Sequence, residues 1–121
     1  MPGKIKKNSI KIKRAYEQSK TSDGTRILVD RLWPRGLSKR KAAIDEWMRD
    51  IAPSTALRKW FGHEPTRWGA FRARYREELR RKPEQLKHLR ALAREGLVTL
   101  VYSAHDESHN NAVVLRSVIL K

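Results

Sequence analysis

The polar side chains best suited to chemistry in this sequence are crowded between residues 103 and 110, directly after an apolar run. The imidazole of His109 is a candidate general acid or base, or else it hydrogen-bonds the preceding loop. Asp106 is a second candidate for proton transfer, and either Asp106 or Ser108 is placed to cap the helix that follows. The backbone N–H groups at the start of that helix favour an anion. Other polar residues of the segment are Ser103, His105 and Asn110.

A second polar segment covers residues 30–36 and reads Asp-Arg-Leu-Trp-Pro-Arg-Gly. Its Pro and Gly end regular structure and form a rigid corner. The guanidinium groups of Arg31 and Arg35 match carboxylate or phosphate groups, and Asp30 is a candidate for proton transfer. The alternative is structural, in which Asp30 and Arg31 pair or cap the turn while Trp33 fills the core.

Between these segments, Arg58 and His63 flank an aromatic pair at residues 60–61. Arg58 lies at the rim of a helical apolar face, from which it reaches either a ligand or the carboxylate of Asp30. We therefore predict two sets of site residues. The catalytic candidates are Asp30, Asp106 and His109. The substrate-binding candidates are Arg31, Arg35, Arg58, His63, Ser103 and Asn110.

The sequence disfavours several other kinds of site. It contains no Cys, which removes thiol nucleophiles, disulfides and thiolate metal sites. No Gly-x-Ser-x-Gly elbow, Walker loop or Gly-x-Gly-x-x-Gly motif occurs. His105 and His109 straddle a loop instead of sharing a helix, so we predict neither a metal nor a cofactor.

Hydrophobic spacing predicts about three strands and about five helices around these segments. The strands are expected at about 10–16, 27–29 and 97–102. The helices are expected from Ser38 to Ile51, from Ser54 to Phe61, from Thr66 through Leu79, from Pro83 to Gly96, and from Asn111 to Leu120. Residues 1–8 are expected to form a basic flexible tail, and residues 9–121 a single domain.

These elements predict an α/β fold, in which a short and at least partly parallel sheet packs with the helices in a single small domain. In open α/β sheets, ligands bind at the carboxyl ends of strands, beside the helix N-termini that follow. The two polar segments, 30–36 and 103–110, occupy these positions. We therefore expect a ligand to bind between them.

The chain is strongly basic, with 28 Lys and Arg against 13 Asp and Glu in 121 residues. The excess is concentrated in residues 4–20 and 67–82. It indicates either a nucleic-acid-binding surface or a solvated basic surface. No apolar run is long enough to span a membrane and no leader peptide is evident, so we expect a cytoplasmic protein without a membrane partner.

Together these segments resemble the YeaO-like family, a domain of unknown function (DUF488). The resemblance covers about residues 9–120. In the first half of the chain it rests on the 30–36 string and on Pro-Ser-x-x-Leu-Arg-x-Trp-Phe-x-His at 53–63. In the second half it rests on Trp-x-x-Phe-x-x-x-Tyr at 68–75, on Tyr-Ser-Ala at 102–104 with Asp106, and on His-Asn-x-Ala-Val-Val-Leu at 109–115. It implies a small bacterial or archaeal cytoplasmic α/β protein. Other branches carry Cys-His-Arg where this chain has Ser-His-Asn at 108–110, which argues against Cys-based chemistry. His105 stands where the family usually has Lys.

We expect this protein to bind, and potentially to process, an anionic small molecule or nucleotide between the two polar segments. Whether it is an enzyme and which oligomer it forms are left open. The alternative function is a basic nucleic-acid-binding module that uses residues 4–20 and 67–82, and a third is an interaction protein in which the Trp-rich motif is only a scaffold. The steep salt dependence of phosphate contacts distinguishes the nucleic-acid hypothesis.

Overall fold

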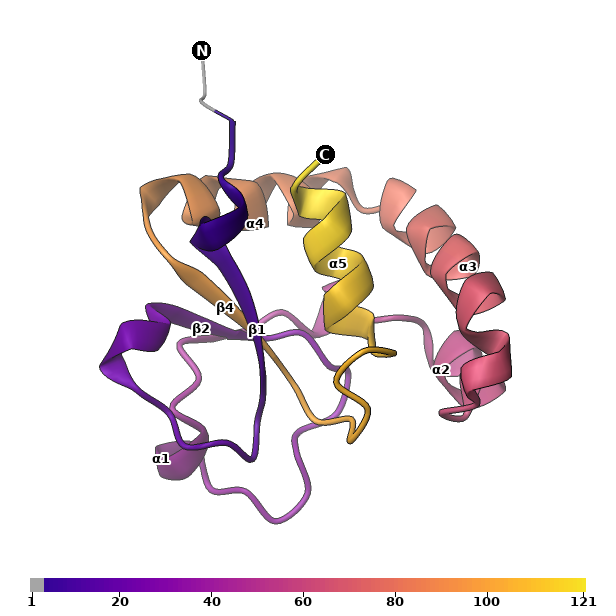
Figure 1. The fold of residues 1–121 in the computed structure, drawn as a ribbon, viewed down its shortest axis with the longest axis horizontal. Coiled ribbons are helices and arrows are strands. Elements are labelled where there is room, and N and C mark those ends of the chain that lie inside the picture. Colours follow the sequence, from indigo (N-terminus) through magenta and orange to yellow (C-terminus); the bar gives the residue numbers. More distant parts are fainter. Residues whose placement is uncertain (1–3) are drawn as a thin grey trace.

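Four parallel strands form the centre of the computed structural model, which describes residues 4–121 (Figure 1). Their order in the sheet is β1-β4-β2-β3. The strands are β1 (Ile10–Arg14), β2 (Thr25–Leu28), β3 (Glu46–Trp47) and β4 (Val98–Tyr102). Ile10 and Thr25 both pair with Val98, so the late strand β4 lies between the two early ones.

Within residues 4–121, five α-helices pack around this sheet, which confirms the predicted α/β class. They are α1 (Lys39–Ala42), α2 (Thr55–Phe61), α3 (Trp68–Arg80), α4 (Pro83–Glu95) and α5 (Asn111–Ile119). Figure 1 shows α5 beside β1, with α3 on its other side and α2 against α3. Ser54 caps α2 as expected, because its hydroxyl accepts a hydrogen bond from the Leu57 amide at 3.1 Å.

The two faces of the sheet are covered differently. On one face, Ile10, Ile27 and Leu100 pack against buried side chains of α3, α4 and α5 in the main core. On the other face, a smaller cluster of Leu28 and Val101 is covered by side chains of the 33–47 segment. Alternation along parallel strands explains this division, since successive side chains point to opposite faces.

The predicted helix from Ser38 to Ile51 is wrong beyond its first turn. Ser38 does cap a helix, since its hydroxyl accepts from the Lys41 amide at 3.1 Å, but α1 ends at Ala42. Ala43 adopts a left-handed conformation with φ 48°, which stops the helix. The chain then forms the short strand β3 beside β2 and a 3-10 turn at Arg49–Ile51. The sheet therefore has four strands, where about three were expected.

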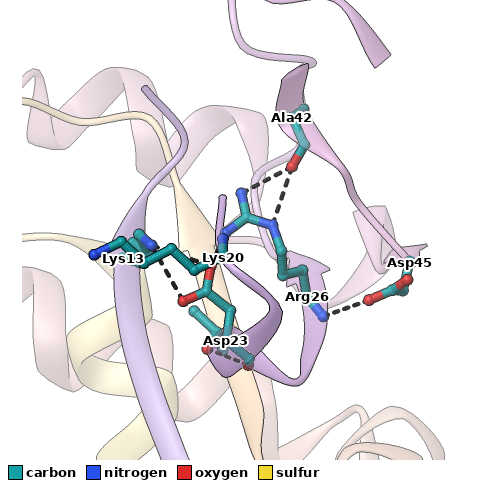
Figure 2. A network of polar contacts seen from close by, with 7 residues as sticks. Lys13, Lys20, Asp23, Arg26, Ala42 and Asp45 are labelled. Carbon is teal, nitrogen blue, oxygen red and sulfur yellow. Dashed lines mark hydrogen bonds and ion pairs between the residues drawn. The ribbon is translucent and has the colours of Figure 1, made fainter. Parts of the chain in front are cut away.

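A buried polar network anchors the second face of the sheet (Figure 2). The Asp23 carboxylate accepts hydrogen bonds from the Arg26 guanidinium at 2.7 Å and from the Lys13 ammonium at 3.1 Å. Arg26 also donates to the carbonyl of Ala42 through Nε and Nη2, and its backbone amide donates to Asp45. The side chains of Arg26 and Asp23 are only 3% and 8% exposed. The network thereby joins β1, β2 and α1.

The start of the described chain packs onto this fold. Ile5 contacts the main core, and Lys7–Ser9 form a 3-10 turn. Arg116 on α5 donates to the carbonyls of Lys7 and Ile10, both at 2.7 Å. Residues 1–3 of the expected flexible tail lie outside the described residues, and the tail stays a prediction. Within residues 4–121, no helix has the length and apolar character needed to cross a membrane.

Candidate functional site

A cleft of about 1240 Å³ opens where β1, β4 and β2 end, and it extends to α2. This location follows the rule that parallel sheets bind ligands at the carboxyl ends of their strands. The nine residues predicted for the site all line the cleft. They are Asp30, Arg31, Arg35, Arg58, His63, Ser103, Asp106, His109 and Asn110. The structure thus brings the candidates together, while their roles stay predictions.

Asp30 joins the ends of two strands to the start of α5. Its Oδ2 accepts hydrogen bonds from the backbone amide of Ser103 at 2.9 Å and from the Ser103 hydroxyl at 2.6 Å. Its Oδ1 accepts from Asn111 Nδ2 at 3.1 Å, and Asn111 also donates to the carbonyl of Val29. The Asp30 carbonyl accepts from the Trp47 indole at 2.7 Å. These contacts give Asp30 a structural role in the cleft wall, with both carboxylate oxygens engaged.

Asp106 holds the loop before α5 and orients an imidazole. Its Oδ1 accepts from the backbone amides of Ser108 and His109, and its Oδ2 lies 2.8 Å from His109 Nδ1. The hydrogen bonds from the His109 ring and the Ser108 amide hold the pKa of Asp106 below its usual value of 3.8. A neutral His109 that donates from Nδ1 keeps Nε2 as an acceptor. The edge of that ring also packs against Trp68, with centroids 5.1 Å apart.

The cap of α5 differs from the sequence expectation. Asn110 is the N-cap, because its Oδ1 accepts from the Val113 amide at 3.1 Å. Asn110 also donates to the Asp106 carbonyl and is 2% exposed, which closes the loop onto the helix. Neither Asp106 nor Ser108 caps the helix, because both precede it by more than one residue. His109 therefore lies before the first turn of α5.

Arg31 turns away from Asp30 and fastens the segment before α2. Its guanidinium donates to the carbonyls of Pro53 and Ala52 at 3.2 and 3.3 Å. The Asp30–Arg31 pair, which was one option of the structural alternative, is absent from residues 4–121. Helix α3 holds the same segment from its other side, since the buried hydroxyl of Tyr75 donates to the Ile51 carbonyl at 2.7 Å. Burial raises the pKa of Tyr75 well above 10, so the hydroxyl keeps its proton as a donor.

The two other predicted arginines differ from Arg31 in having no internal partner. Arg35 and Arg58 are exposed, and no hydrogen bond or ion pair within residues 4–121 engages either guanidinium. The suggested contact from Arg58 to Asp30 is absent among residues 4–121. The Asp30 carboxylate accepts hydrogen bonds from Ser103 and Asn111 instead. Arg58 lies on α2, and His63 follows that helix in a left-handed conformation with φ 59°. His63 is exposed at the cleft, and its ring lies 6.2 Å from the Phe61 ring.

Sequence reasoning missed the contribution of β1 to the cleft. Arg14 is the last residue of this strand and Tyr16 follows it, and both line the cleft. Arg14 donates to the Ala104 carbonyl at 2.9 Å and lies 3.5 Å from His105 Nδ1, and the Tyr16 hydroxyl donates to the Arg35 carbonyl at 2.8 Å. The signal was present in the sequence, since β1 was expected to be a strand. Only its position beside β4, which brings its end to the cleft, was not foreseen.

The cleft carries a surplus of positive charge. Four arginines line it, Arg14, Arg31, Arg35 and Arg58, against the two carboxylates of Asp30 and Asp106. Hydrogen-bond donors of the 103–111 segment surround both carboxylates, and neither carboxylate forms an ion pair with an arginine within residues 4–121. Within residues 4–121, no group of three or more His, Asp or Glu side chains is arranged to hold a metal ion. The cleft is therefore suited chemically to an anion.

The second basic segment, 67–82, is largely engaged within the molecule. The guanidinium of Arg74 lies 4.0 Å from the Trp60 ring centroid, and that of Arg72 lies 5.8 Å from the Trp68 ring. Arg80 pairs with Glu77, and Lys82 donates to the carbonyls of Asp50 and Ala52. Burial and the nearby Arg31 lower the pKa of Lys82. Much of this charge therefore stabilises α3 and the residue 50–54 segment.

These features define a class of protein: an α/β domain with an all-parallel sheet and a cationic cleft at the ends of its strands. Comparison of the sequence with known families identifies the group within that class. The chain belongs to the YeaO-like DUF488 family, and the description that matches residues 9–121 is "Inactive DUF488-N3 subclade".

Two relatives illustrate how far the similarity extends. The uncharacterized protein YeaO of Escherichia coli is 46% identical over 107 residues, which cover 88% of this chain and 93% of that protein. An uncharacterized protein of Mycobacterium bovis is 36% identical over 115 residues, which cover 95% of this chain and 97% of its own. No solved structure matches significantly.

Proposed function

We propose that this chain is a cytoplasmic binding protein whose cleft holds an anionic small molecule. One observation carries the proposal: the guanidinium groups of Arg35 and Arg58 have no acceptor within the described chain. The carboxylates of Asp30 and Asp106, which line the same cleft, accept hydrogen bonds from the 103–111 segment instead. Exposed guanidinium groups in a concave site are well suited to carboxylate or phosphate ligands.

Binding without turnover is the version of this function that we favour. Of the three catalytic candidates, Asp30 is engaged through both carboxylate oxygens, and Asp106 orients His109 while it holds its own loop. His109 is then the single candidate left for proton transfer. The chain also has Ser108 in place of a thiol. The description of the family as inactive is in keeping with this interpretation.

Nuclear magnetic resonance provides the test. Ribose 5-phosphate and the common nucleoside 5′-monophosphates are titrated into ¹⁵N-labelled protein, and the arginine Nε–H signals are followed with the backbone amides. We expect shifts at Arg58 and around residues 103–110, and Arg58→Ala should weaken binding about tenfold, as for the loss of a charged hydrogen bond. Lys59→Ala, which removes an exposed neighbouring charge, should leave binding unchanged. The ³¹P spectrum of the ligand should stay constant overnight.

Two results would overturn the proposal. One is the absence of shifts with every phosphate compound. The other is equal affinity of the wild type and Arg58→Ala, because the unpaired guanidinium would then have no part in binding. A change in the ³¹P spectrum would show that the ligand is turned over at the site and not only bound. His109→Gln should then abolish the change.

A second candidate function is nucleic-acid binding through residues 4–20 and 67–82. The observation in its favour is that the ammonium groups of several exposed lysines in the first segment have no carboxylate partner within residues 4–121. These are Lys4, Lys6, Lys7 and Lys11. Titration of a short RNA at low and moderate salt tests this candidate. Affinity that falls by powers of ten, with shifts spread over both segments, would favour it over the cleft.

A further inference from the structure

Two exposed apolar side chains mark the mouth of the cleft. Tyr16 and Leu32 are the large hydrophobic residues that stand out as exposed among residues 4–121, with 44% and 58% of their surface accessible. Both line the cleft, although they come from different strand ends. A simple anion gains nothing from such side chains. A ligand with an apolar face would remove them from water.

The ring of Tyr16 is held in place although it is exposed. Its hydroxyl donates to the Arg35 carbonyl at 2.8 Å, and the Arg14 guanidinium lies 5.3 Å from the ring centroid. The polar tip of the residue is therefore already satisfied within the protein. What Tyr16 offers a ligand is a fixed aromatic surface beside a cation, which is the combination that stacks with planar bases.

The cationic residue Arg58 lines the same cleft from a different element, helix α2. Figure 1 shows the end of β1 and helix α2 on opposite sides of the loop that follows β4, and the cleft reaches both. A cleft of about 1240 Å³ has room for far more than one phosphate group, since pockets for drug-sized molecules begin at about 300 Å³. A ligand that contacts both the Tyr16 ring and the Arg58 guanidinium needs a planar group as well as an anionic one.

We propose that the ligand is a mononucleotide whose base stacks on Tyr16 beside Leu32 and whose phosphate is bound by Arg58. This inference rests on the proposed function and specifies the class of anion. A sugar phosphate has no flat aromatic face, so it would leave Tyr16 and Leu32 in water. The base of a nucleotide supplies that face, and its ribose joins the base to the phosphate.

Isothermal titration calorimetry with matched ligands and matched variants tests this assignment. Ribose 5-phosphate and the 5′-monophosphates of adenosine, guanosine, cytidine and uridine are compared on the wild type, Tyr16→Leu and Tyr16→Phe. We expect at least one nucleotide to bind about tenfold or more tightly than ribose 5-phosphate, which is typical of a stacked base. Tyr16→Leu should abolish this preference, measured as the ratio of nucleotide affinity to ribose 5-phosphate affinity in the same variant, while Tyr16→Phe should retain the preference because the ring remains.

The outcomes separate this inference from the proposed function. If ribose 5-phosphate and all four nucleotides bind equally, the anion site stands and the nucleotide assignment is overturned. If a nucleotide is preferred but Tyr16→Leu leaves the preference intact, the stacking position is wrong. If a short RNA binds and none of the small phosphates does, both proposals fail. Thermal unfolding of the two variants confirms that each is folded before it is titrated.

Discussion

Asp30 accepts two hydrogen bonds on one carboxylate oxygen from a single residue, Ser103, which lies at the end of the neighbouring strand. One bond comes from the backbone amide at 2.9 Å and the other from the hydroxyl at 2.6 Å. The end of β2 is thus fixed to the end of β4 at the floor of the cleft. This contact makes Asp30 more important for the shape of the site than for proton transfer.

Asp30→Asn is therefore expected to lower the free energy of unfolding by about 2 kcal/mol. Both carboxylate oxygens of Asp30 now accept hydrogen bonds from Ser103 and Asn111, and in the variant the side-chain NH₂ group would face one of these donors. The measurement is urea denaturation at neutral pH. Asp50→Asn is the matched control, since the exposed Asp50 side chain has no hydrogen bond within the described chain. Equal unfolding midpoints for the two variants would contradict the structural role of Asp30.

Asp23 is expected to contribute stability that depends on pH. Burial alone raises the pKa of this carboxyl, but hydrogen bonds from the Lys20 amide, Lys13 and Arg26 lower the pKa below 3.8. A lowered folded pKa stabilises the protein above the unfolded value, and this stability is lost as the pH falls through the folded value. At neutral pH, Asp23→Asn should cost about 3 to 5 kcal/mol, because it leaves Arg26 buried without its partner.

The difference between the wild type and Asp23→Asn should therefore be largest near neutral pH and shrink once the pH falls below 3.8. Urea denaturation at a series of pH values measures it. A difference that stays constant down to acidic pH would show that the charge of Asp23 is not what stabilises the network.

Asp106 is expected to control the order of the loop before α5. In Asp106→Asn, the backbone amides of Ser108 and His109 lose a charged acceptor, so their hydrogen exchange should be faster by roughly fivefold to tenfold. The wild type should show the same loss of protection, expressed relative to the intrinsic exchange rate at each pH, as the pH falls through the lowered pKa of Asp106. Glu107→Gln removes an adjacent exposed charge and should leave both rates unchanged, and a similar effect of both variants would refute the specific role.

Two glycines are expected to respond in opposite directions to the same substitution. Gly24 has φ 66°, and a Cβ there would lie 2.3 Å from the Leu97 carbonyl oxygen, so Gly24→Ala should lose about 3 kcal/mol or more. Gly69 lies within α3 with open space around its Cβ position, so Gly69→Ala should gain about 0.5 to 1 kcal/mol. Thermal unfolding of both variants checks the signs, and a stable Gly24→Ala would contradict the close approach at Leu97.

Local sequence patterns predicted two kinds of element correctly. One is a helix with a continuous buried side, and the other is a strand that is buried along its whole length. Helix α3 places Phe71, Tyr75 and Leu79 on one buried side, as their spacing requires, and β4 is buried along its whole length. The error at 38–51 arose because apolar residues such as Trp47 and Met48 fit a helical stripe equally well. Contacts that are distant in sequence decide against the helix: Met48 donates to the Leu28 carbonyl and the Trp47 indole to that of Asp30.

The position of the candidate site was predictable because the ends of parallel strands meet at one edge of a sheet. The partners of its residues were not. Arg31 could be read as a partner of Asp30, yet it reaches the carbonyls at 52–53, and Asn111 takes the place beside the carboxylate. These hydrogen-bond partners depend on how segments that are distant in sequence lie in space. That arrangement follows from the order of the strands in the sheet, which could not be predicted from the sequence alone.

The central position of β4 also determines when the protein can fold during its synthesis. Every residue of β1 pairs with β4, from Ile10 with Val98 to Arg14 with Tyr102, and β2 otherwise has only the two residues of β3 as neighbours. A ribosome therefore releases β1 long before its partner exists, and pairing over so many intervening residues is slow. Until residue 98 emerges, the apolar faces of β1 and β2 lack the strand that lies between them, so we expect a fragment that stops before β4 to aggregate instead of folding.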